Sequence, residues 1–181
     1  MTSIIKKLLY IIIFAVIYFV LERFMRITTA LEYIHFSYSH PLLNAVSIII
    51  GPFVGSFASG LGEFLVYWSQ NLPTDWGSVL CSFLNCGTVG FLMKNVDIKS
   101  GFFMRTDIKR YNISQFTSTF VCWSIIYPIF NVLMKVKDFQ SSFNYGFGHF
   151  VGIGLTNFVA GTLMLTLYAK NRISAANFYR S

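Results

Sequence analysis

Charged residues are scarce in this chain of 181 residues. Only 12% of the side chains are charged and seven of them are acidic, whereas 55% are hydrophobic and 18% are aromatic. A soluble domain carries about 25% charged residues, so this chain has too few of them for an ordinary water-exposed surface. The composition excludes a typical soluble globular protein and predicts that lipid surrounds much of the chain.

Cysteines and catalytic motifs are equally sparse. Cys81, Cys86 and Cys122 lie in apolar stretches with no CxxC pair, so we expect buried thiols and no metal site. The strings HExxH, GxSxG and GxxxxGK[ST] are missing, which predicts no catalytic residue and no nucleotide-binding loop. The net charge of +7 does not indicate nucleic-acid binding, because the basic residues collect in loops rather than along one polar face.

Long apolar runs occupy most of the remaining sequence. A helix needs about 20 mostly apolar residues to cross a bilayer, and the first run is too long and lacks the cleavage pattern of a signal peptide. Pro52 separates the second run from the third, and Pro128 predicts a kink in the fifth. We therefore predict an all-α integral membrane protein, a compact bundle of six transmembrane helices in one domain over residues 1–181. The predicted spans are about 4–21, 41–50, 53–69, 77–93, 112–134 and 145–169.

The distribution of basic residues predicts the orientation of this bundle. Six spans place both termini on one side, and that side holds ten basic residues against four on the other. Basic loops stay cytoplasmic, so we expect both termini inside the cell in the plasma membrane of a bacterium. The connectors 22–40, 70–76 and 135–144 then face outward.

The outward ends of the spans carry most residues suited to holding a small molecule. Tyr127 and Asn131, and likewise Tyr145 and His149, are four residues apart and share a helix face. Aromatic rings, imidazoles and amides are suited to cover a flat ring and satisfy its polar edge. An interfacial aromatic belt and interhelical hydrogen bonds explain the same residues as well. The candidate substrate-binding residues are His35, Phe36, Tyr38, His40, Trp76, Asn85, Tyr127, Asn131, Asn144, Tyr145 and His149.

Glu63 is the only carboxylate deep inside a predicted span. Ionisable residues in a membrane are costly and usually face the bundle or a cavity, so Glu63 is a polar anchor near a site, a docking contact or a hydrogen-bonded packing group. Small residues such as Gly148 and Gly152 form a GxxxG pattern. This pattern predicts close helix packing and says nothing about function.

Several strings resemble the substrate-binding S-components of energy-coupling factor (ECF) vitamin transporters, and the riboflavin-type subfamily is the most similar. The strongest is GPFVG at 51–55 followed by GLGE at 60–63, which is similar to a glycine-rich turn of that family. The family's ordered motifs also resemble WGS at 76–78, YNISQ at 111–115, GTLML at 161–165 and YAK at 168–170.

The resemblance implies a transport function without catalysis. An S-component captures a vitamin outside the cell and delivers it through a membrane coupling subunit and two ATPases, which use the ATP, so this chain needs no cofactor. The resemblance also implies docking on the coupling subunit, for which Ala15, Phe19 and Glu63 are the candidates. Riboflavin and cobalamin both remain open as ligands. A small membrane enzyme and a ligand-free assembly protein are the alternative functions.

Overall fold

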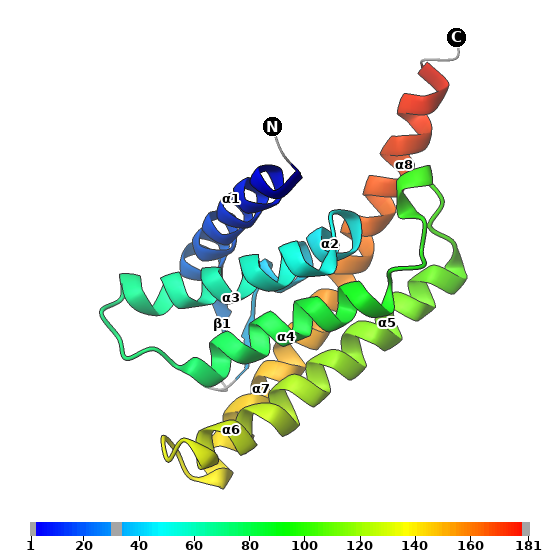
Figure 1. Cartoon of the computed structure of the whole chain (residues 1–181). Coiled ribbons are helices and arrows are strands. Elements are labelled where there is room, and N and C mark those ends of the chain that lie inside the picture. The colour runs from blue at the N-terminus through cyan, green and yellow to red at the C-terminus, as the bar shows by residue number, and fades with distance from the viewer. Residues whose placement is uncertain (1–2, 30–33, 179–181) are drawn as a thin grey trace.

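The computed structural model describes residues 3–29 and 34–178, and helices account for most of them (Figure 1). The elements in chain order are α1 (Ser3–Phe24), β1 (Ile27–Thr28), β2 (His35–Phe36), α2 (Ser39–Ile49), α3 (Pro52–Ser69), α4 (Trp76–Leu92), η1 (Ile98–Ser100), α5 (Arg105–Thr119), η2 (Phe120–Ile126), α6 (Tyr127–Leu133), α7 (Phe139–Thr156), η3 (Asn157–Gly161) and α8 (Thr162–Phe178). The predicted helical class is confirmed, with one short antiparallel hairpin, β1 and β2, added to it.

Two long rods form the C-terminal half because helices continue through π-helical turns. The first rod runs over 105–133 through η2, and the second over 139–178 through η3. Pro128 lies at the start of α6, directly after a π-helical turn, and the helix continues across it. Both rods begin earlier than predicted, at 105 rather than 112 and at 139 rather than 145. The apolar pattern missed their polar first turns, one of which Asp138 caps by accepting a hydrogen bond from the Ser141 amide at 2.9 Å.

Membrane-spanning length is clear for three of the helices. Within the described residues, Ile4–Phe24, Arg105–Leu133 and Phe139–Arg172 are long and apolar enough to cross a bilayer, and Trp76–Leu92 is a shorter apolar helix. The 11-residue helix α2 rises only about 16 Å, roughly half of a hydrocarbon core of about 30 Å. The structure therefore supports a helical membrane protein, while six complete crossings stay a prediction.

The sharp break between α2 and α3 follows from two residues. Gly51 has a φ of +146°, a conformation that side chains with a Cβ rarely adopt. Pro52 then occupies the first turn of α3, where an amide hydrogen is not needed. The predicted break at this pair is confirmed. It leaves α2 packed against both α3 and α4.

The helices form two packed groups that share the interior. α1 packs along α3, which packs along α4, while the two rods pack on one another through α5, α6 and α7. Figure 1 shows both chain ends at the top of the view, and η1, which packs against α8, lies beyond the upper end of α4. The connections from α3 to α4 and from α6 to α7 lie at the opposite end. The described chain thus enters and leaves the bundle at the same end.

Glycines allow the closest contacts between these elements. A Cβ on Gly62 would lie 2.6 Å from the Tyr18 ring of α1, and one on Gly146 would collide with the carbonyl oxygen of Trp123. The same kind of contact joins Gly152 of α7 to the backbone of β2 at His35. The close packing predicted from small residues is therefore confirmed. The three cysteines are buried and free, as predicted.

Candidate functional site

The hairpin after α1 brings the His35 imidazole into the bundle, where it meets His149 of α7. β1 and β2 pair in antiparallel register, with Thr28 opposite His35. The β2 backbone rests on Gly152 of α7, and the His35 ring meets the His149 ring edge-on at a centroid distance of 5.5 Å. The connector that was predicted to carry ligand-binding residues at the membrane surface therefore reaches the interior of the bundle.

A stack of aromatic rings forms one wall of this region. The His149 ring stacks on Tyr145 at 4.3 Å and on Trp123 at 4.6 Å, and Tyr145 stacks on Tyr127 at 5.3 Å. Tyr145 and His149 share a face of α7, as their spacing predicted. The rings come from both rods, so rod packing positions the wall. Trp123 and His149 of this stack contribute aromatic surface, with ring nitrogens at its edge, to the cavity between the helices.

A hydrogen-bonded chain crosses from α2 through α1 to α3. The Tyr18 hydroxyl donates to Glu63 Oε2 at 2.6 Å, and its oxygen lies 3.2 Å from His40 Nε2. Because Tyr18 uses its single hydrogen on Glu63, His40 Nε2 is the donor in the second bond, which leaves His40 Nδ1 as an acceptor. The three side chains are buried. Helix packing thus fixes the tautomer of one imidazole.

A second carboxylate, Glu22, lies at the end of α1. It is 8% exposed and accepts hydrogen bonds from Ser37 and, at 2.7 Å, from Ser39. Arg26, one helical turn later, approaches its other oxygen at 3.6 Å. The charge and the acceptor capacity of Glu22 are therefore largely satisfied by the protein.

These groups enclose a small polar cavity of about 10 Å³, roughly the space of one water molecule. Its lining residues are Glu22, His35, Ser37, His40, Glu63, Trp123, His149 and Ile153. Among the residues that the structure describes, no hydrogen-bond partner reaches the Nδ1 atoms of the three histidines or Nε1 of Trp123. Buried polar atoms without partners are rare, so these four atoms around one cavity make it the candidate binding site.

A polar cluster closes the outer end of the ring stack. The Tyr127 hydroxyl donates to Asp75 Oδ2 at 2.7 Å. Lys137 lies 3.5 Å from the same carboxylate oxygen and 4.8 Å from the centroid of the Tyr145 ring. Asp75 also caps α4 by accepting from the Ser78 amide at 3.0 Å. The α3–α4 and α6–α7 connections are thereby held together across the stack.

The electrostatics favour a neutral His35. Burial, aided by the positive charge of Arg26 and opposed by Glu22, lowers the pKa of His35 from 6.5 to about 4. The imidazole is therefore uncharged at neutral pH and acts as a hydrogen-bonding and stacking group. Among the described residues, no group of three or more His, Cys, Asp or Glu side chains is arranged to hold a metal ion.

The structure brings five of the predicted substrate-binding residues together. His35, His40 and His149 line the cavity, and Tyr127 and Tyr145 extend its aromatic wall. Asn131 lies behind that wall, buried, and donates to the Tyr127 carbonyl at 3.2 Å.

Five other predicted ligand residues lie outside the cavity. Phe36 and Tyr38 line a shallow groove on the far side of the hairpin. Asn85 is buried and accepts from Thr119 at 3.3 Å, while Asn144 is exposed and accepts from Gln140 at 2.9 Å. The fifth, Trp76, belongs to an outer groove on the α3–α4 face. Contact between any of these residues and a ligand stays a prediction.

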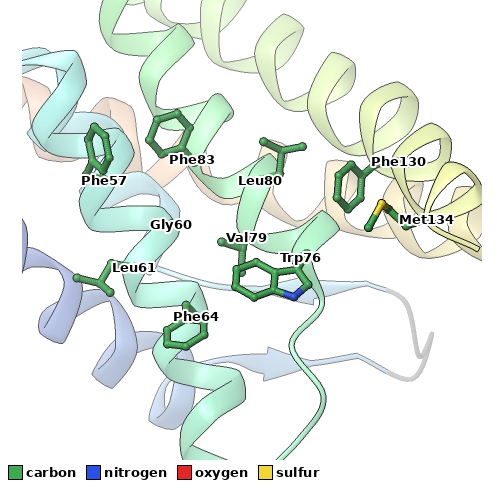
Figure 2. A pocket seen from close by; sticks show the side chains of 10 residues that line it. All are labelled: Phe57, Gly60, Leu61, Phe64, Trp76, Val79, Leu80, Phe83, Phe130 and Met134. Carbon is green, nitrogen blue, oxygen red and sulfur yellow. The ribbon is translucent and has the colours of Figure 1, made fainter. Parts of the chain in front are cut away.

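Figure 2 shows that outer groove, a hollow of about 760 Å³ to which α3, α4 and α6 contribute side chains. Its lining residues are Phe57, Gly60, Leu61, Phe64, Trp76, Val79, Leu80, Phe83, Phe130 and Met134. Trp76 is 56% exposed and stacks on Phe64 at 5.9 Å. Apart from the indole nitrogen, these side chains have no polar atom that would orient a ligand. This groove is much larger than the polar cavity, but its apolar lining is suited to lipid chains rather than to orienting a polar ligand.

The predicted docking residues do not form a common outer face. Ala15 is fully buried, Phe19 is half-buried and Glu63 lines the cavity. The exposed face of α1 consists of other apolar side chains, among them Ile12 and Val16.

Sequence reasoning missed Glu22, Ser37, Trp123 and Ile153 of the cavity lining, and Tyr18, which hydrogen-bonds to Glu63. Glu22 was assigned to the connector because the predicted span ended at 21, whereas α1 continues to Phe24 and carries it inward. Tyr18 and Trp123 looked like ordinary apolar span residues. The four-residue spacing from Tyr18 to Glu22 was the available signal, because it places both on one face of α1.

Comparisons with known proteins agree with this architecture. The sequence profile of the family described as "ECF-type riboflavin transporter, S component" matches residues 2–171. A UPF0397 protein of Enterococcus faecalis is 27% identical over 172 residues, covering 93% of this chain and 92% of that protein. UPF0397 proteins of Staphylococcus aureus (25% identical, 93% of this chain, 92% of theirs) and Lactobacillus acidophilus (27%, 93% and 91%) are similar over nearly the same length.

Proposed function

Because this chain belongs to the S-component family of ECF-type riboflavin transporters, we propose that it binds a vitamin in the polar cavity and hands it to a transport complex. The family implies a membrane coupling subunit and two ATPases as partners. The chain itself then acts as a binding protein, and the ATP is used by the partners. We propose that the cavity end faces outward and the basic end, with both termini, faces the cytoplasm.

The observation that carries this proposal is the cavity, where a flat aromatic wall meets buried polar atoms that have no partner within the described residues. The Trp123, His149 and Tyr145 rings are suited to stack against a planar ring system. His40 Nδ1 and Trp123 Nε1 supply one acceptor and one donor at the same place. Ligand sites combine an apolar wall with a few placed polar groups in this way.

Ligand entry requires movement, because a cavity of about 10 Å³ is far smaller than any vitamin. The parts free to move are those that close the outer end. The Asp75–Lys137 ion pair spans two connections and is partly exposed, so it contributes only about 0–1 kcal/mol. We propose that these connections and the β1–β2 hairpin separate to admit the ligand and close over it.

The identity of the vitamin is tested by isolation. The protein is purified in mild detergent from cells grown in rich medium, and co-purified compounds are identified by mass spectrometry. Riboflavin and cobalamin are then titrated into ligand-free protein by calorimetry. Recovery of any vitamin with the protein, or binding of either titrated vitamin, supports the proposal, and protein that co-purifies with no vitamin and binds neither contradicts it.

Tryptophan variants locate the site. Trp123→Ala removes part of the aromatic wall and is expected to weaken vitamin binding about tenfold or more, since large buried rings dominate binding energies. Trp68→Ala removes a ring of the same size from the outer surface, where Trp68 is 69% exposed, and is the matched control, with affinity expected within about twofold of the unmodified protein. Weaker binding in a third variant, Trp76→Ala, with affinity unchanged in Trp123→Ala, would move the site to the groove of Figure 2.

A further inference from the structure

The two carboxylates that line the cavity differ in their hydrogen-bond and ion-pair partners. Two carboxylates, Glu22 and Glu63, line the cavity. Arg26 and two serine hydroxyls serve Glu22. Within the described part of the chain, no lysine, arginine or histidine forms an ion pair with Glu63, and its hydrogen-bond partner is the Tyr18 hydroxyl. Of the other cations at this end, Lys137 pairs with Asp75. Glu63 therefore faces the cavity with unused acceptor capacity.

Two neighbouring side chains add one more hydrogen-bond acceptor and one donor to the cavity. The hydrogen bonds of Tyr18 leave His40 Nδ1 as a bare acceptor, and His40 is only 2% exposed. Trp123 is fully buried, and its Nε1–H has no partner among the described residues. The cavity lining thus includes the Glu63 carboxylate and His40 Nδ1, both acceptors, together with the Trp123 Nε1–H, a donor. A buried carboxylate without a positively charged partner is unfavourable, and the single hydroxyl donor of Tyr18 leaves most of the acceptor capacity of Glu63 unused.

We propose that the ligand is a planar nitrogen heterocycle whose edge presents N–H donors, from amino groups or a protonated ring nitrogen, to Glu63 and His40. Its ring lies against Trp123 and His149, and a ring acceptor receives the Trp123 Nε1–H. Two adjacent N–H groups match a carboxylate as the arginine fork does. An imide edge, which places carbonyl oxygens on both sides of a single N–H, would bring acceptors against acceptors. This inference rests on the proposed function and narrows its substrate class.

A matched pair of ring compounds tests the inference. 2,4-Diaminopteridine and 2,4-dioxopteridine have the same ring size and differ at the edge, which is donating in the first and an imide in the second. Binding to purified protein is measured by calorimetry and by thermal shift. We expect the diamino compound to bind at least about tenfold more tightly, which is the range for a hydrogen bond to a charged group. Equal binding, stronger binding of the dioxo compound or no binding of either overturns the inference.

Glu63→Gln tests the assigned partner, with Asp97→Asn as control because Asp97 is exposed and far from the cavity. Glu63→Gln keeps the side-chain shape, removes the charge and turns one acceptor into a donor. We expect it to reduce the preference for the diamino compound to about threefold or less, and Asp97→Asn to leave it unchanged. Retention of the preference in Glu63→Gln overturns the inference. If riboflavin binds with an affinity that Glu63→Gln leaves unchanged, the proposed function stands and the inference fails.

Discussion

Single side chains near the cavity are set by partners that come from other helices. Tyr18 of α1 fixes the His40 tautomer, and the backbone of α7 supports the hairpin that carries His35. A substitution at one of these positions therefore changes a neighbour's protonation or orientation as well as removing its own contacts. Measurements on single variants therefore need a second observable that reports the protonation or orientation of the neighbouring side chain.

The pKa of His35 predicts whether the stability of the folded protein rises or falls with pH. Its pKa is about 4 in the folded protein, below the ordinary 6.5, so the unfolded chain takes up the proton first as the pH falls. Its contribution to stability is complete above about pH 6.5 and is lost as the pH falls toward 4. We expect this loss to be on the order of 1 kcal/mol, because solvent screens a partly exposed imidazole.

Thermal unfolding in detergent between pH 7 and pH 4.5 measures this effect. The unfolding temperature should fall with pH in the unmodified protein and fall less in His35→Asn, which cannot take up the proton. Identical pH dependences in the two proteins would show that His35 is not the responsible group.

The sequence predicted side-chain pairs within one helix better than pairs between helices. Tyr145 and His149 were placed on one face by their spacing, and their rings do stack. Tyr18 and Glu63 are 45 residues apart, and nothing in the local pattern joins them. Trp123 was missed because a buried aromatic residue in an apolar run has no distinguishing periodicity.

At the scale of elements, glycines decide how closely the hairpin and the rods approach. Gly152→Ala would place a Cβ 2.9 Å from the His35 carbonyl carbon and closer still to its oxygen, so β2 would have to move away from α7. We expect a destabilisation of about 1–3 kcal/mol, typical of overpacking, together with weaker ligand binding.

Gly154→Ala is the matched control on the same helix. Its Cβ would meet no described atom closer than 3.9 Å, so alanine is accommodated and favours the helix. Its unfolding temperature should be unchanged or higher. Equal losses in the two variants would mean that helix α7, rather than its contact with β2, determines the effect.

Helix positions followed from apolar runs, whereas their ends and irregularities did not. The break at Gly51 and Pro52 was predicted because both residues have strong backbone preferences. The π-helical turns η2 and η3 lie in segments whose apolar composition suits an α-helix equally well. They depend on packing between the rods, which a single sequence does not display.

At the scale of the whole molecule, the cavity and most of the basic residues lie toward opposite ends of the bundle, and this asymmetry predicts the sides of the membrane. Gln140 lies in the first turn of α7 at the cavity end, and Lys99 lies in η1 at the other end; both are exposed. Gln140→Cys should react with a membrane-impermeant maleimide on intact cells. Lys99→Cys should react only after the membrane is made permeable.

The three native cysteines are buried, so their background labelling should be low. Labelling of Lys99→Cys on intact cells, with protection of Gln140→Cys, would reverse the orientation and place the cavity on the cytoplasmic side. Import from outside would then be contradicted.

The stacked Trp123 ring has a practical consequence for such measurements. The chain has three tryptophans, and Trp68 and Trp76 are largely exposed on the outer surface, whereas Trp123 is completely buried against His149. Phenylalanine at positions 68 and 76 would leave one indole emitter inside the cavity wall. Its fluorescence would then report occupancy directly, without an attached dye, and allow arrival and departure of the cargo to be timed in stopped-flow experiments.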